Sequence, residues 1–413
     1  MQIYKFGGIS VKNADAIRNI SEIVRNAKSN IVVVISAMGK MTNKFEELVN
    51  NYFSNKNYST TLQEIKDYHL NIINDLFNQN SDFLLKIDVL FNELENKLSE
   101  KVSSNFDYEY DKLIVFGELL STTIISEYLN YLGLKNNWLD IRNSIITDGF
   151  YRDGRVLWNE TKANLKNNIL NKSIVVTQGF IASDEKGNSV TLGREGSDFT
   201  ASIIAYSLNA ESVTIWKDVP GILTADPRIF NDTVKIDNLN YKETVELAYY
   251  GAQVIHPKTI KPLQNKKIPL FVKSFKTPNE SGTVINSEKI NISSPIIILK
   301  KNQVLISISP KDFSFIDETN ISKIYTALAE LKIKVNLMEN SAVSFSIVTD
   351  NSNKIERFID KLKSHYLIKY NTSLELLTIR HYNKNKINEL LNNKEVLVEQ
   401  KTRFTARYVI KNN

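Results

Sequence analysis

The sequence predicts an α/β fold built on a mostly parallel sheet, followed by an α+β region toward the C-terminal end. Short β-branched runs alternate with segments whose apolar residues recur at helical spacing, and residues 31–35 form the clearest of these runs. A strand that is apolar at every position is typical of a sheet covered by helices on both faces. Beyond residue 300 the expected order changes to strand, helix, strand, strand, helix, strand.

Composition excludes several classes of protein. The 413 residues are 42% hydrophobic and 24% charged, which is ordinary for a globular chain of two or three domains. The absence of cysteine excludes disulfides, thiolate catalysis and cysteine-ligated metals, and the four histidines lack metal-ligand spacing. No apolar run approaches about 18 residues, so we expect a cytoplasmic protein without a leader or a membrane partner. The net charge of +6 includes no block of like charges, so we expect no nucleic-acid partner.

The first expected strand ends in a glycine turn. Lys5 lies on the strand, Gly7 and Gly8 follow it, and residues 14–24 then have helical spacing. Backbone N–H groups of such a turn, together with a lysine beside them, can hold a phosphate. The alternative is that the glycines serve close packing alone. The spacing matches neither the Rossmann nor the P-loop motif.

Polar side chains follow two further apolar runs. Ser36 and Thr42 come after the strand at residues 31–35, and Glu118 follows residues 113–116, which we expect to form a buried strand. Ligands of open α/β sheets bind at the carboxyl edge, where these groups would meet. Ser36 and Thr42 could instead form a polar turn, and Glu118 could simply complement a helix dipole. As a ligand group, Glu118 would receive an ammonium.

A second candidate anion site lies in residues 193–198. Gly193 and Gly196 bracket Arg194, and Ser197 and Asp198 open a helical pattern. The planar fork of arginine fits a carboxylate or a phosphate in bidentate fashion, and a helix N-terminus adds N–H donors. Asp198 could alternatively be the cap of that helix.

These motifs, taken together, resemble the aspartate kinases. The matching segments are Lys5 to Val11, Ser36-Ala37, Thr42-Asn43, Gly117-Glu118, Gln178 to Phe180, Leu192 to Asp198, Ile215 to Gly221, Asp226 to Arg228 and His256-Pro257. They cover the chain from Lys5 to about Ile285. The resemblance implies an amino-acid-kinase catalytic domain over residues 1–290, a three-layer αβα sandwich with a helical insertion at 44–110.

The resemblance also implies an activity and its residues. The enzyme would transfer the γ-phosphoryl group of ATP, bound with Mg²⁺, to the β-carboxylate of L-aspartate, the first step of lysine, threonine and methionine biosynthesis. No tightly bound cofactor is implied. The implied catalytic residues are Lys5, Arg194 and Asp198. The implied substrate-binding residues are Ser36, Thr42, Glu118, Arg194 and Ser197. The implied ATP-binding residues are Lys5, Gly7, Gly8, Lys217, Asp218, Leu223, Arg228 and Gln253.

The sequence departs from the family pattern at several positions. The family usually has Thr at Ile9, Gly at Glu195, Thr or Ser at Lys217 and Lys at Gln253. It also has an aromatic residue where Leu223 stands. We expect these differences to bear mainly on the ATP site, where Lys217 would replace the charge that Gln253 lacks.

Residues 295–413 are expected to form a regulatory region after a linker near 291–295. The first set of elements, about 302–371, is ferredoxin-like, and a shorter second set comprises 372–413 with 295–300. Aspartate kinases carry paired ACT domains here. The resemblance implies a homodimer and feedback by lysine or threonine bound near Met338, Asn340 and Ser341. The alternative is a dimerisation module without a ligand.

Two other functions fit parts of the sequence. One is a different kinase of the same fold, acting on glutamate, acetylglutamate or a nucleotide. The other is a catalytically weak amino-acid sensor, which the departures at the ATP site would permit. No Rossmann-type motif follows the regulatory region, so we expect a monofunctional enzyme without a fused homoserine dehydrogenase.

Overall fold

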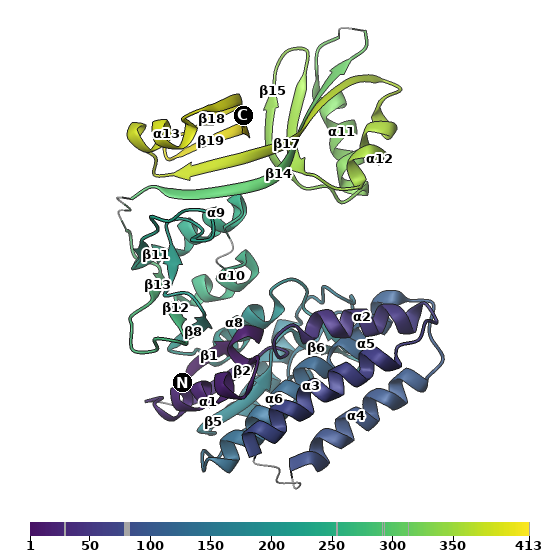
Figure 1. Cartoon of the computed structure of the whole chain (residues 1–413), viewed down its shortest axis with the longest axis vertical. Coiled ribbons are helices and arrows are strands. Elements are labelled where there is room, and N and C mark those ends of the chain that lie inside the picture. The colour runs from purple at the N-terminus through teal and green to yellow at the C-terminus, as the bar shows by residue number, and fades with distance from the viewer. Residues whose placement is uncertain are drawn as a thin grey trace. The chain divides into compact units, whose positions relative to one another are not determined.

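The computed structural model describes residues 1–28, 30–77, 83–252, 255–290, 292, 294–312 and 314–412. The chain divides into two compact units, coloured along the sequence in Figure 1. The first unit comprises Met1–Ile222, Lys235–Val245 and Gln253–Ile290. The second comprises Leu223–Val234, Glu246–Ala252 and Asn291–Asn413. Among the described residues, no helix has the length and apolar character needed to cross a membrane.

An eight-stranded sheet forms the centre of the first unit. Its order is β11-β13-β12-β8-β1-β2-β5-β3, and every neighbouring pair is parallel except β12 and β13. The strands are β1 (Gln2–Phe6), β2 (Ile31–Ile35), β3 (Asn137–Leu139), β5 (Ile174–Gln178), β8 (Ser212–Lys217), β11 (Asn238–Asn240), β12 (Leu270–Ser274) and β13 (Thr283–Asn286). Every residue of β2 is buried, as the apolar run predicted.

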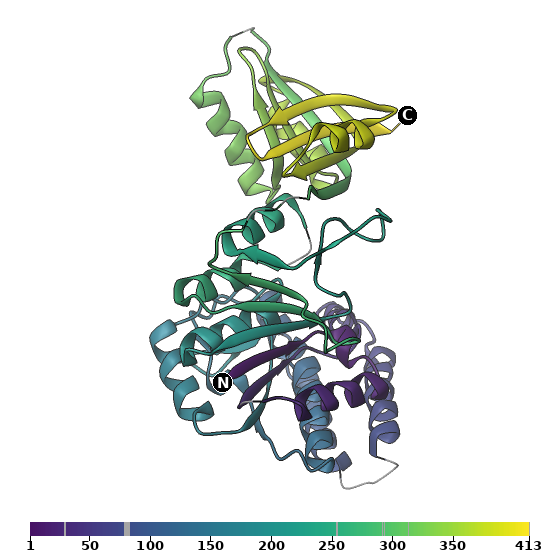
Figure 2. The same cartoon turned by 90° about the vertical axis from the view of Figure 1, so that its left-hand side faces the viewer.

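Helices cover both faces of this sheet, as Figure 2 shows. The helices described up to residue 266 are α1 (Ala14–Arg25), α2 (Met41–Phe53), α3 (Ser59–Phe77), α4 (Leu84–Ser99), α5 (Phe106–Ile114), α6 (Phe116–Tyr131), α7 (Trp158–Ile169), α8 (Gly196–Leu208), α9 (Tyr241–Tyr250) and α10 (Pro257–Lys266). Helix α8 packs on β1, β2 and β8, whereas α6 packs on β2 and β5. The three-layer α/β class expected from the sequence is confirmed, and the described part of residues 44–110 is mostly helical, with connections at 54–58 and 100–105.

The strand expected at residues 113–116 is wrong. Leu113 and Ile114 end helix α5, Phe116 begins helix α6, and Val115 lies between the two helices. A short run that is apolar throughout has the same periodicity in a buried helix as in a buried strand, and here the run lies inside two buried helices. Glu118 therefore lies in the first turn of α6 rather than at a strand end.

The described residues also form a three-stranded sheet and a two-stranded sheet. Strands β4 (Ile146–Thr147), β6 (Ile181–Asp184) and β7 (Ser189–Thr191) form one, and β9 (Ile222–Leu223) pairs with β10 (Lys235–Ile236) in the other. The dipeptide Gly187-Asn188 is typical of a hairpin turn, and this turn joins β6 to β7. Asp184 stabilises this turn, because its Oδ1 accepts hydrogen bonds from the backbone N–H groups of residues 186 and 188 at 2.9 and 2.8 Å.

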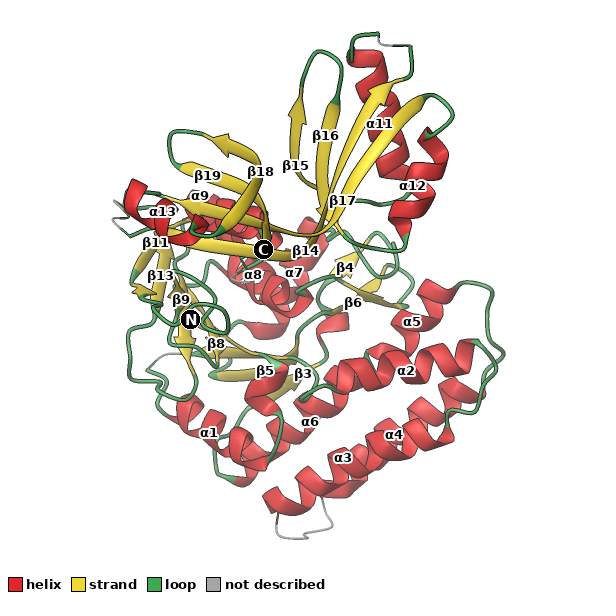
Figure 3. Cartoon of the chain, turned by 45° about the horizontal axis from the view of Figure 1, so that its top comes forward, coloured by secondary structure: helices red, strands yellow, loops and turns green. Residues whose placement is uncertain are grey.

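One six-stranded antiparallel sheet forms the core of the second unit (Figure 3). Its order is β15-β16-β14-β17-β19-β18, with β14 (Ile296–Pro310), β15 (Val335–Asn340), β16 (Phe345–Asp350), β17 (Tyr366–Arg380), β18 (Lys394–Lys401) and β19 (Thr405–Asn412). Strands β14 and β17 pair from Ile296 with Arg380 to Pro310 with Tyr366, with register shifts at residues 300–305. The two sets of elements expected from the sequence thus share these long strands in one sheet.

The helices of the second unit pack on two separate parts of that sheet. Helices α11 (Glu318–Glu330) and α12 (Lys354–Leu362) bury a cluster that includes Ile306 and Phe358. Helix α13 (Lys384–Leu391) lies over another cluster that includes Leu377 and Tyr408. The helical spacing of apolar residues predicts helices at 320–331, 354–362 and 384–391, each within two residues of the observed bounds.

Candidate active site

One pocket of about 580 Å³ in the first unit brings together most of the residues singled out in the sequence. The members predicted from the sequence are Lys5, Ser36, Thr42, Glu118, Arg194, Ser197, Asp198 and Lys217. Lys5 comes from β1 and Arg194 from the loop before α8, so two cations almost 190 residues apart in the chain open into the same cavity.

Lys5 is held by an ion pair in the middle of the sheet. It lies on β1 between Val34 of β2 and Ile215 of β8. Its Nζ is 2.8 Å from Oδ1 of Asp198, and the two side chains are only 12% and 6% exposed. A buried ion pair holds both partners in place, because moving either one away leaves an uncompensated charge. The first turn of α8 thus fixes the lysine ammonium at the pocket.

Close packing requires a glycine at residue 8, in the turn after β1. A Cβ on Gly8 would lie 2.7 Å from the carbonyl oxygen of Gly39 and 2.8 Å from that of Ala37. The N–H of Gly39 also donates to the carbonyl of Gly8 at 2.9 Å. A Cβ on Gly7 would lie 3.4 Å from Lys5 Nζ, so this turn runs directly beside the ammonium. Neither glycine is among the residues that line the pocket.

Glu118 presents a carboxyl with unused hydrogen-bonding capacity. The side chain is buried, and the N–H of Ala37 donates to Oε1 at 3.4 Å. Its Oε2 has no hydrogen-bond partner among the described residues. Burial raises the pKa of Glu118 to about 8. A buried carboxyl at a pocket wall is suited to a cationic ligand group, whose charge would favour the ionised form.

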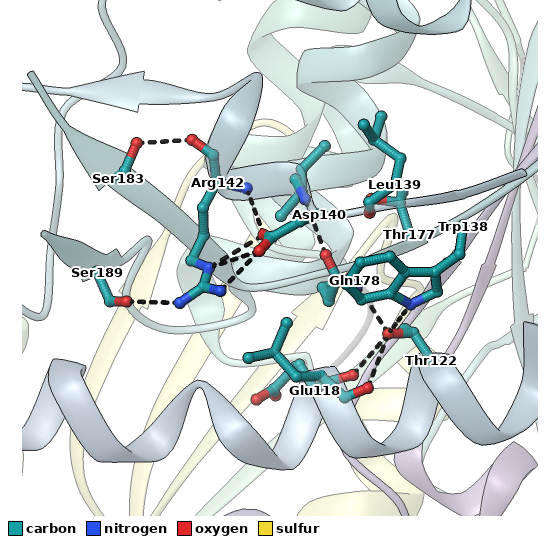
Figure 4. Close-up of polar contacts among 12 residues, drawn as sticks. Glu118, Thr122, Trp138, Leu139, Asp140, Arg142, Thr177, Gln178, Ser183 and Ser189 are labelled. Atoms are coloured by element: carbon teal, nitrogen blue, oxygen red, sulfur yellow. Dashed lines mark hydrogen bonds and ion pairs between the residues drawn. The ribbon is translucent and has the colours of Figure 1, made fainter. Parts of the chain in front are cut away.

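A hydrogen-bonded network behind the pocket fixes the backbone of Glu118 (Figure 4). Thr122 Oγ1 donates to the carbonyl of Glu118 at 2.9 Å. The same oxygen accepts from Gln178 Nε2 at 2.8 Å and from Trp138 Nε1 at 3.0 Å. Gln178 Oε1 in turn accepts from the N–H of Ile141 at 2.8 Å. Helix α6 is therefore tied to β5 and β3 through Thr122, one turn after Glu118.

Arg194 lies in a tight loop between β7 and α8. Gly193 has a φ of +76°, and a Cβ on Gly196 would lie 2.7 Å from the Phe180 ring. Glu195 has a φ of +54°, the left-handed region that favours glycine. This chain therefore holds an ordinary side chain in a strained conformation at the position where the family usually has glycine.

The pocket also contains residues to which the sequence motifs assigned no catalytic or binding role. They are Glu46, Tyr110, Arg152, Phe180, Thr191, Gly193, Glu195 and Gly196. Tyr110 Oη donates to Glu46 Oε1 at 2.8 Å, and the Arg152 guanidinium lies 4.3 Å from the centre of the Tyr110 ring. Phe180 had a sequence signal, since it lies in one of the matching segments. Arg152 lies in a loop without a motif and had none.

Asp111 fixes the backbone of two of these additional pocket residues, Arg152 and Thr191. Its Oδ2 accepts from the N–H groups of Arg152 at 2.8 Å and Thr191 at 2.9 Å, and its Oδ1 accepts from Thr191 Oγ1 at 2.8 Å. Burial raises the pKa of Asp111 to about 6, although these hydrogen bonds oppose the shift. One buried carboxyl thus fixes two segments that line the pocket.

The predicted nucleotide residues are spread more widely. Lys217 lines the pocket, and Asp218 follows it in the loop after β8. Gln253 lies outside the described residues. Leu223 and Arg228 belong to the second compact unit, where Arg228 Nε and Nη2 donate to the two carboxyl oxygens of Asp226 at 3.0 and 2.7 Å. Among the residues described, no group of three or more histidines and carboxylates could hold a metal ion.

The predicted effector residues lie on the edge strand β15 and just after it. Met338 is 52% exposed, and Tyr325 Oη donates to its sulfur at 2.9 Å. Asn340 is exposed at the end of the strand. Ser341 forms a small turn with Ser344, whose N–H donates to Ser341 Oγ at 3.2 Å.

Comparisons with known proteins identify the family of this chain. Residues 1–274 match the model of the amino acid kinase family. The lysine-sensitive aspartokinase 3 of Escherichia coli is 32% identical over 357 residues, which cover 85% of this chain and 78% of that enzyme. This chain belongs to the aspartokinases. Aspartokinase 1 from the Arabidopsis thaliana chloroplast is 31% identical over 366 residues, and the match spans 63% of that relative's length.

Solved structures support the same assignment. E. coli aspartokinase III in complex with aspartate and ADP has a TM-score of 0.82 at 26% identity, covering 99% of our aspartokinase and 96% of that chain. Clostridium acetobutylicum aspartate kinase shares the fold with the same TM-score at 23% identity, covering 100% and 96%. The family assignment argues against the rival kinases of glutamate, acetylglutamate or nucleotides.

Proposed function

We propose that this aspartokinase transfers the γ-phosphoryl group of ATP to the β-carboxylate of L-aspartate, giving 4-phospho-L-aspartate and ADP. The observation that carries the proposal is that Lys5, Glu118 and Arg194 line one pocket. L-Aspartate has one ammonium and two carboxylates, and these three side chains supply the complementary charge for each. The E. coli relative bound to aspartate and ADP supports the same ligands.

The pocket would orient aspartate from its amino-acid end. Glu118 would bind the ammonium, and Arg194 would bind the α-carboxylate through its planar fork. The hydroxyl groups of Ser36, Thr42 and Ser197 also line the pocket and could donate to carboxylate oxygens. With that end fixed, the β-carboxylate would point toward Lys5.

Phosphoryl transfer then needs alignment and charge neutralisation rather than a covalent enzyme intermediate. A β-carboxylate oxygen forms a bond to the γ-phosphorus while the bond to the ADP oxygen breaks. Lys5 would neutralise charge on the phosphoryl oxygens, and Asp198 would position Lys5 through the ion pair described above. The Lys5 ammonium is thus a catalytic group, whereas Asp198 acts through it.

We expect Mg²⁺ to enter with ATP as part of the co-substrate. Lys217 lines the pocket and would contact the polyphosphate. Gly7, Gly8, Asp218, Leu223, Arg228 and Gln253 stay predicted nucleotide contacts. The cytoplasmic location also stays a prediction.

We also propose feedback control by lysine. The E. coli relative is named lysine-sensitive, and its structure has been solved with lysine and aspartate bound. Strand β15 pairs with β16 alone among the described strands, so its outer edge offers backbone groups to a second subunit. A homodimer formed through ACT domains would place Met338, Asn340 and Ser341 at that junction. Sedimentation with and without lysine, and with threonine as the rival effector, tests this assembly.

An aspartyl-hydroxamate assay tests the activity. The purified chain should form hydroxamate only when ATP, Mg²⁺ and L-aspartate are all present, and the Arg194→Ala variant should need far more aspartate. Binding of an amino acid without any turnover would instead support the sensor hypothesis.

A further inference from the structure

We infer that the first unit contains a second small-molecule site, adjacent to the catalytic pocket, that binds an aromatic carboxylate. The site is a separate cavity of about 430 Å³ between α7, α8, α10 and the loop at residues 153–156. This volume is within the range of about 300 to 1,000 Å³ that is typical of ligand pockets. The residues lining it are Asp153, Gly154, Arg155, Val156, Trp158, Phe199, Tyr206, Lys258, Lys261, Pro262 and Asn265.

Aromatic rings form the walls of this cavity. Trp158 and Tyr206 meet edge to face, with ring centroids 5.0 Å apart and an interplanar angle of 71°. Phe199 lies two turns before Tyr206 on the same side of α8. All three rings are only partly buried, so each retains surface that a flat apolar group could cover. This wall favours an aromatic ligand over an aliphatic one.

The charged groups around the cavity favour an anion. Arg155, Lys258 and Lys261 line it against a single carboxylate, Asp153, which forms an ion pair with Lys258. The side chains of Arg155 and Lys261 form no hydrogen bond or ion pair with any residue that the structure describes. Two cations at the rim of an aromatic cavity are therefore available to a carboxylate.

Nearby residues strengthen this positive field. Lys266, on the same helix α10, stacks its Nζ 4.4 Å from the centre of the Tyr206 ring. Burial and then the positive charges of Lys162 and Lys166 lower the pKa of Lys266. These lysines lie on α7, so cations approach the cavity from two of its three helices.

The cavity shares a wall with the catalytic pocket. Arg152 lines the catalytic pocket, and the next residue, Asp153, lines the second cavity. Asp153 Oδ1 lies 2.7 Å from the position that a Cβ on Gly193 would occupy. The Asp153 carboxylate therefore packs against the loop that carries Arg194. On α8, Asp198 and Phe199 are likewise neighbours that line the two different pockets.

A carboxylate bound in the second cavity would compete with Asp153 for Lys258. Release of Asp153 would loosen its contact with Gly193 and let Arg194 shift from its binding position. We therefore expect occupancy to raise the KM for aspartate with little change in kcat. This kinetic effect depends on the proposed kinase function, whereas binding itself does not.

Calorimetric titration of the full chain with 1-naphthoate tests the site. Saturable binding is expected, with at least tenfold weaker binding of 1-naphthalenemethanol, which keeps the rings and lacks the carboxylate. The Arg155→Met/Lys261→Met double variant should weaken 1-naphthoate binding about tenfold. Lys97→Met, which removes a lysine of α4, a helix that does not line the cavity, serves as the matched control and should change affinity less than twofold.

Three results would overturn the inference. Equal affinity for 1-naphthoate and 1-naphthalenemethanol would show that the cations do not contribute to binding. Loss of 1-naphthoate binding in Arg194→Ala would place the ligand in the catalytic pocket instead. If the wild-type protein still binds aspartate but gives no saturable heat with 1-naphthoate, the cavity does not bind such a ligand. If binding is found but the KM for aspartate stays constant, the second site stands and its coupling to Gly193 is wrong.

Discussion

Asp198 Oδ1 lies 2.8 Å from Lys5 Nζ, so the first turn of α8 is joined to the central strand of the sheet by a buried ion pair. The loop carrying Arg194 leads directly into that helix. One contact therefore sets the position of the lysine relative to the segment that would bind the other end of aspartate.

Replacing Asp198 by asparagine tests this positioning role. The shape of the side chain is kept, but the lysine loses its charged partner and gains freedom to move. We expect kcat to fall about a hundredfold, because small misplacements of an aligned group can cost that much, while the KM for aspartate changes little. Steady-state hydroxamate kinetics measure both, with Asp15→Asn on the exposed face of α1 as the control. A large rise in KM with normal kcat would instead make Asp198 a substrate-binding residue.

Replacing Glu118 by glutamine separates stability from binding. The folded-state pKa of Glu118, about 8, is above the value of about 4.3 expected when unfolded, so the folded protein holds an extra proton between these pH values. Wild-type stability should therefore fall as pH rises from about 4.5 to 8, and Glu118→Gln should lack this loss. At pH 8 without aspartate we expect the variant to be more stable by on the order of 2 to 4 kcal/mol.

The same variant should bind aspartate poorly. Glutamine cannot balance the ammonium, so the KM for aspartate should rise at least tenfold. In the wild type, kcat/KM for aspartate should increase with pH up to about 8 as Glu118 ionises. Urea titrations at several pH values and the kinetic pH profile provide the two measurements. Equal stability of the two proteins at pH 5 and pH 8 would contradict the assigned pKa.

Asp111 should matter for both folding and substrate binding. Asparagine retains one carbonyl oxygen, so Asp111→Asn would leave some of the three donors on Arg152 and Thr191 unsatisfied. We expect a loss of roughly 2 to 3 kcal/mol in the free energy of unfolding and a severalfold higher KM for aspartate. Asp88→Asn, exposed on α4, is the matched control. A Tm equal to that of the control would show that this buried carboxyl is dispensable.

Glu195 offers a stabilising substitution. Its φ of +54° suits glycine, so Glu195→Gly should increase the free energy of unfolding by about 1 kcal/mol. Asn209→Gly is a suitable comparison, because Asn209 has a φ of +51° but asparagine tolerates this conformation better. Urea denaturation should show the larger gain at residue 195. A loss of stability there would mean that the Glu195 side chain makes a favourable interaction.

Lys217 tests the nucleotide site. If its ammonium contacts the polyphosphate, Lys217→Ala should raise the KM for ATP about tenfold, equivalent to about 1.4 kcal/mol, and leave the KM for aspartate nearly unchanged. Lys97→Ala, exposed on α4, is the control for loss of a lysine. An unchanged KM for ATP would show that Lys217 does not contact the nucleotide.

Much of the catalytic unit was predictable because strand β2 is apolar at every position and the loops carry compact motifs. Strand β2 and the turn at Gly187-Asn188 follow directly from such patterns. The run at residues 113–116 was misassigned because a fully buried helix has the same apolar signature as a buried strand. The structure alone shows which helix carries Glu118.

The part of the pocket that Asp111 holds together could not be predicted from the sequence. Its contacts join α5 to the segments around Arg152 and Thr191, which are far apart in sequence and carry no motif. The long strands β14 and β17 were likewise read as shorter separate strands, because the register shifts at residues 300–305 interrupt the alternation.

We propose that Arg194 and Lys5 act on opposite ends of one aspartate molecule. The most direct test compares kcat/KM for L-aspartate and for β-alanine, which lacks only the α-carboxylate, in the wild type and in Arg194→Ala. We expect a preference for aspartate of at least a hundredfold in the wild type that falls to less than tenfold in the variant. A preference that survives the loss of Arg194 unchanged would contradict it.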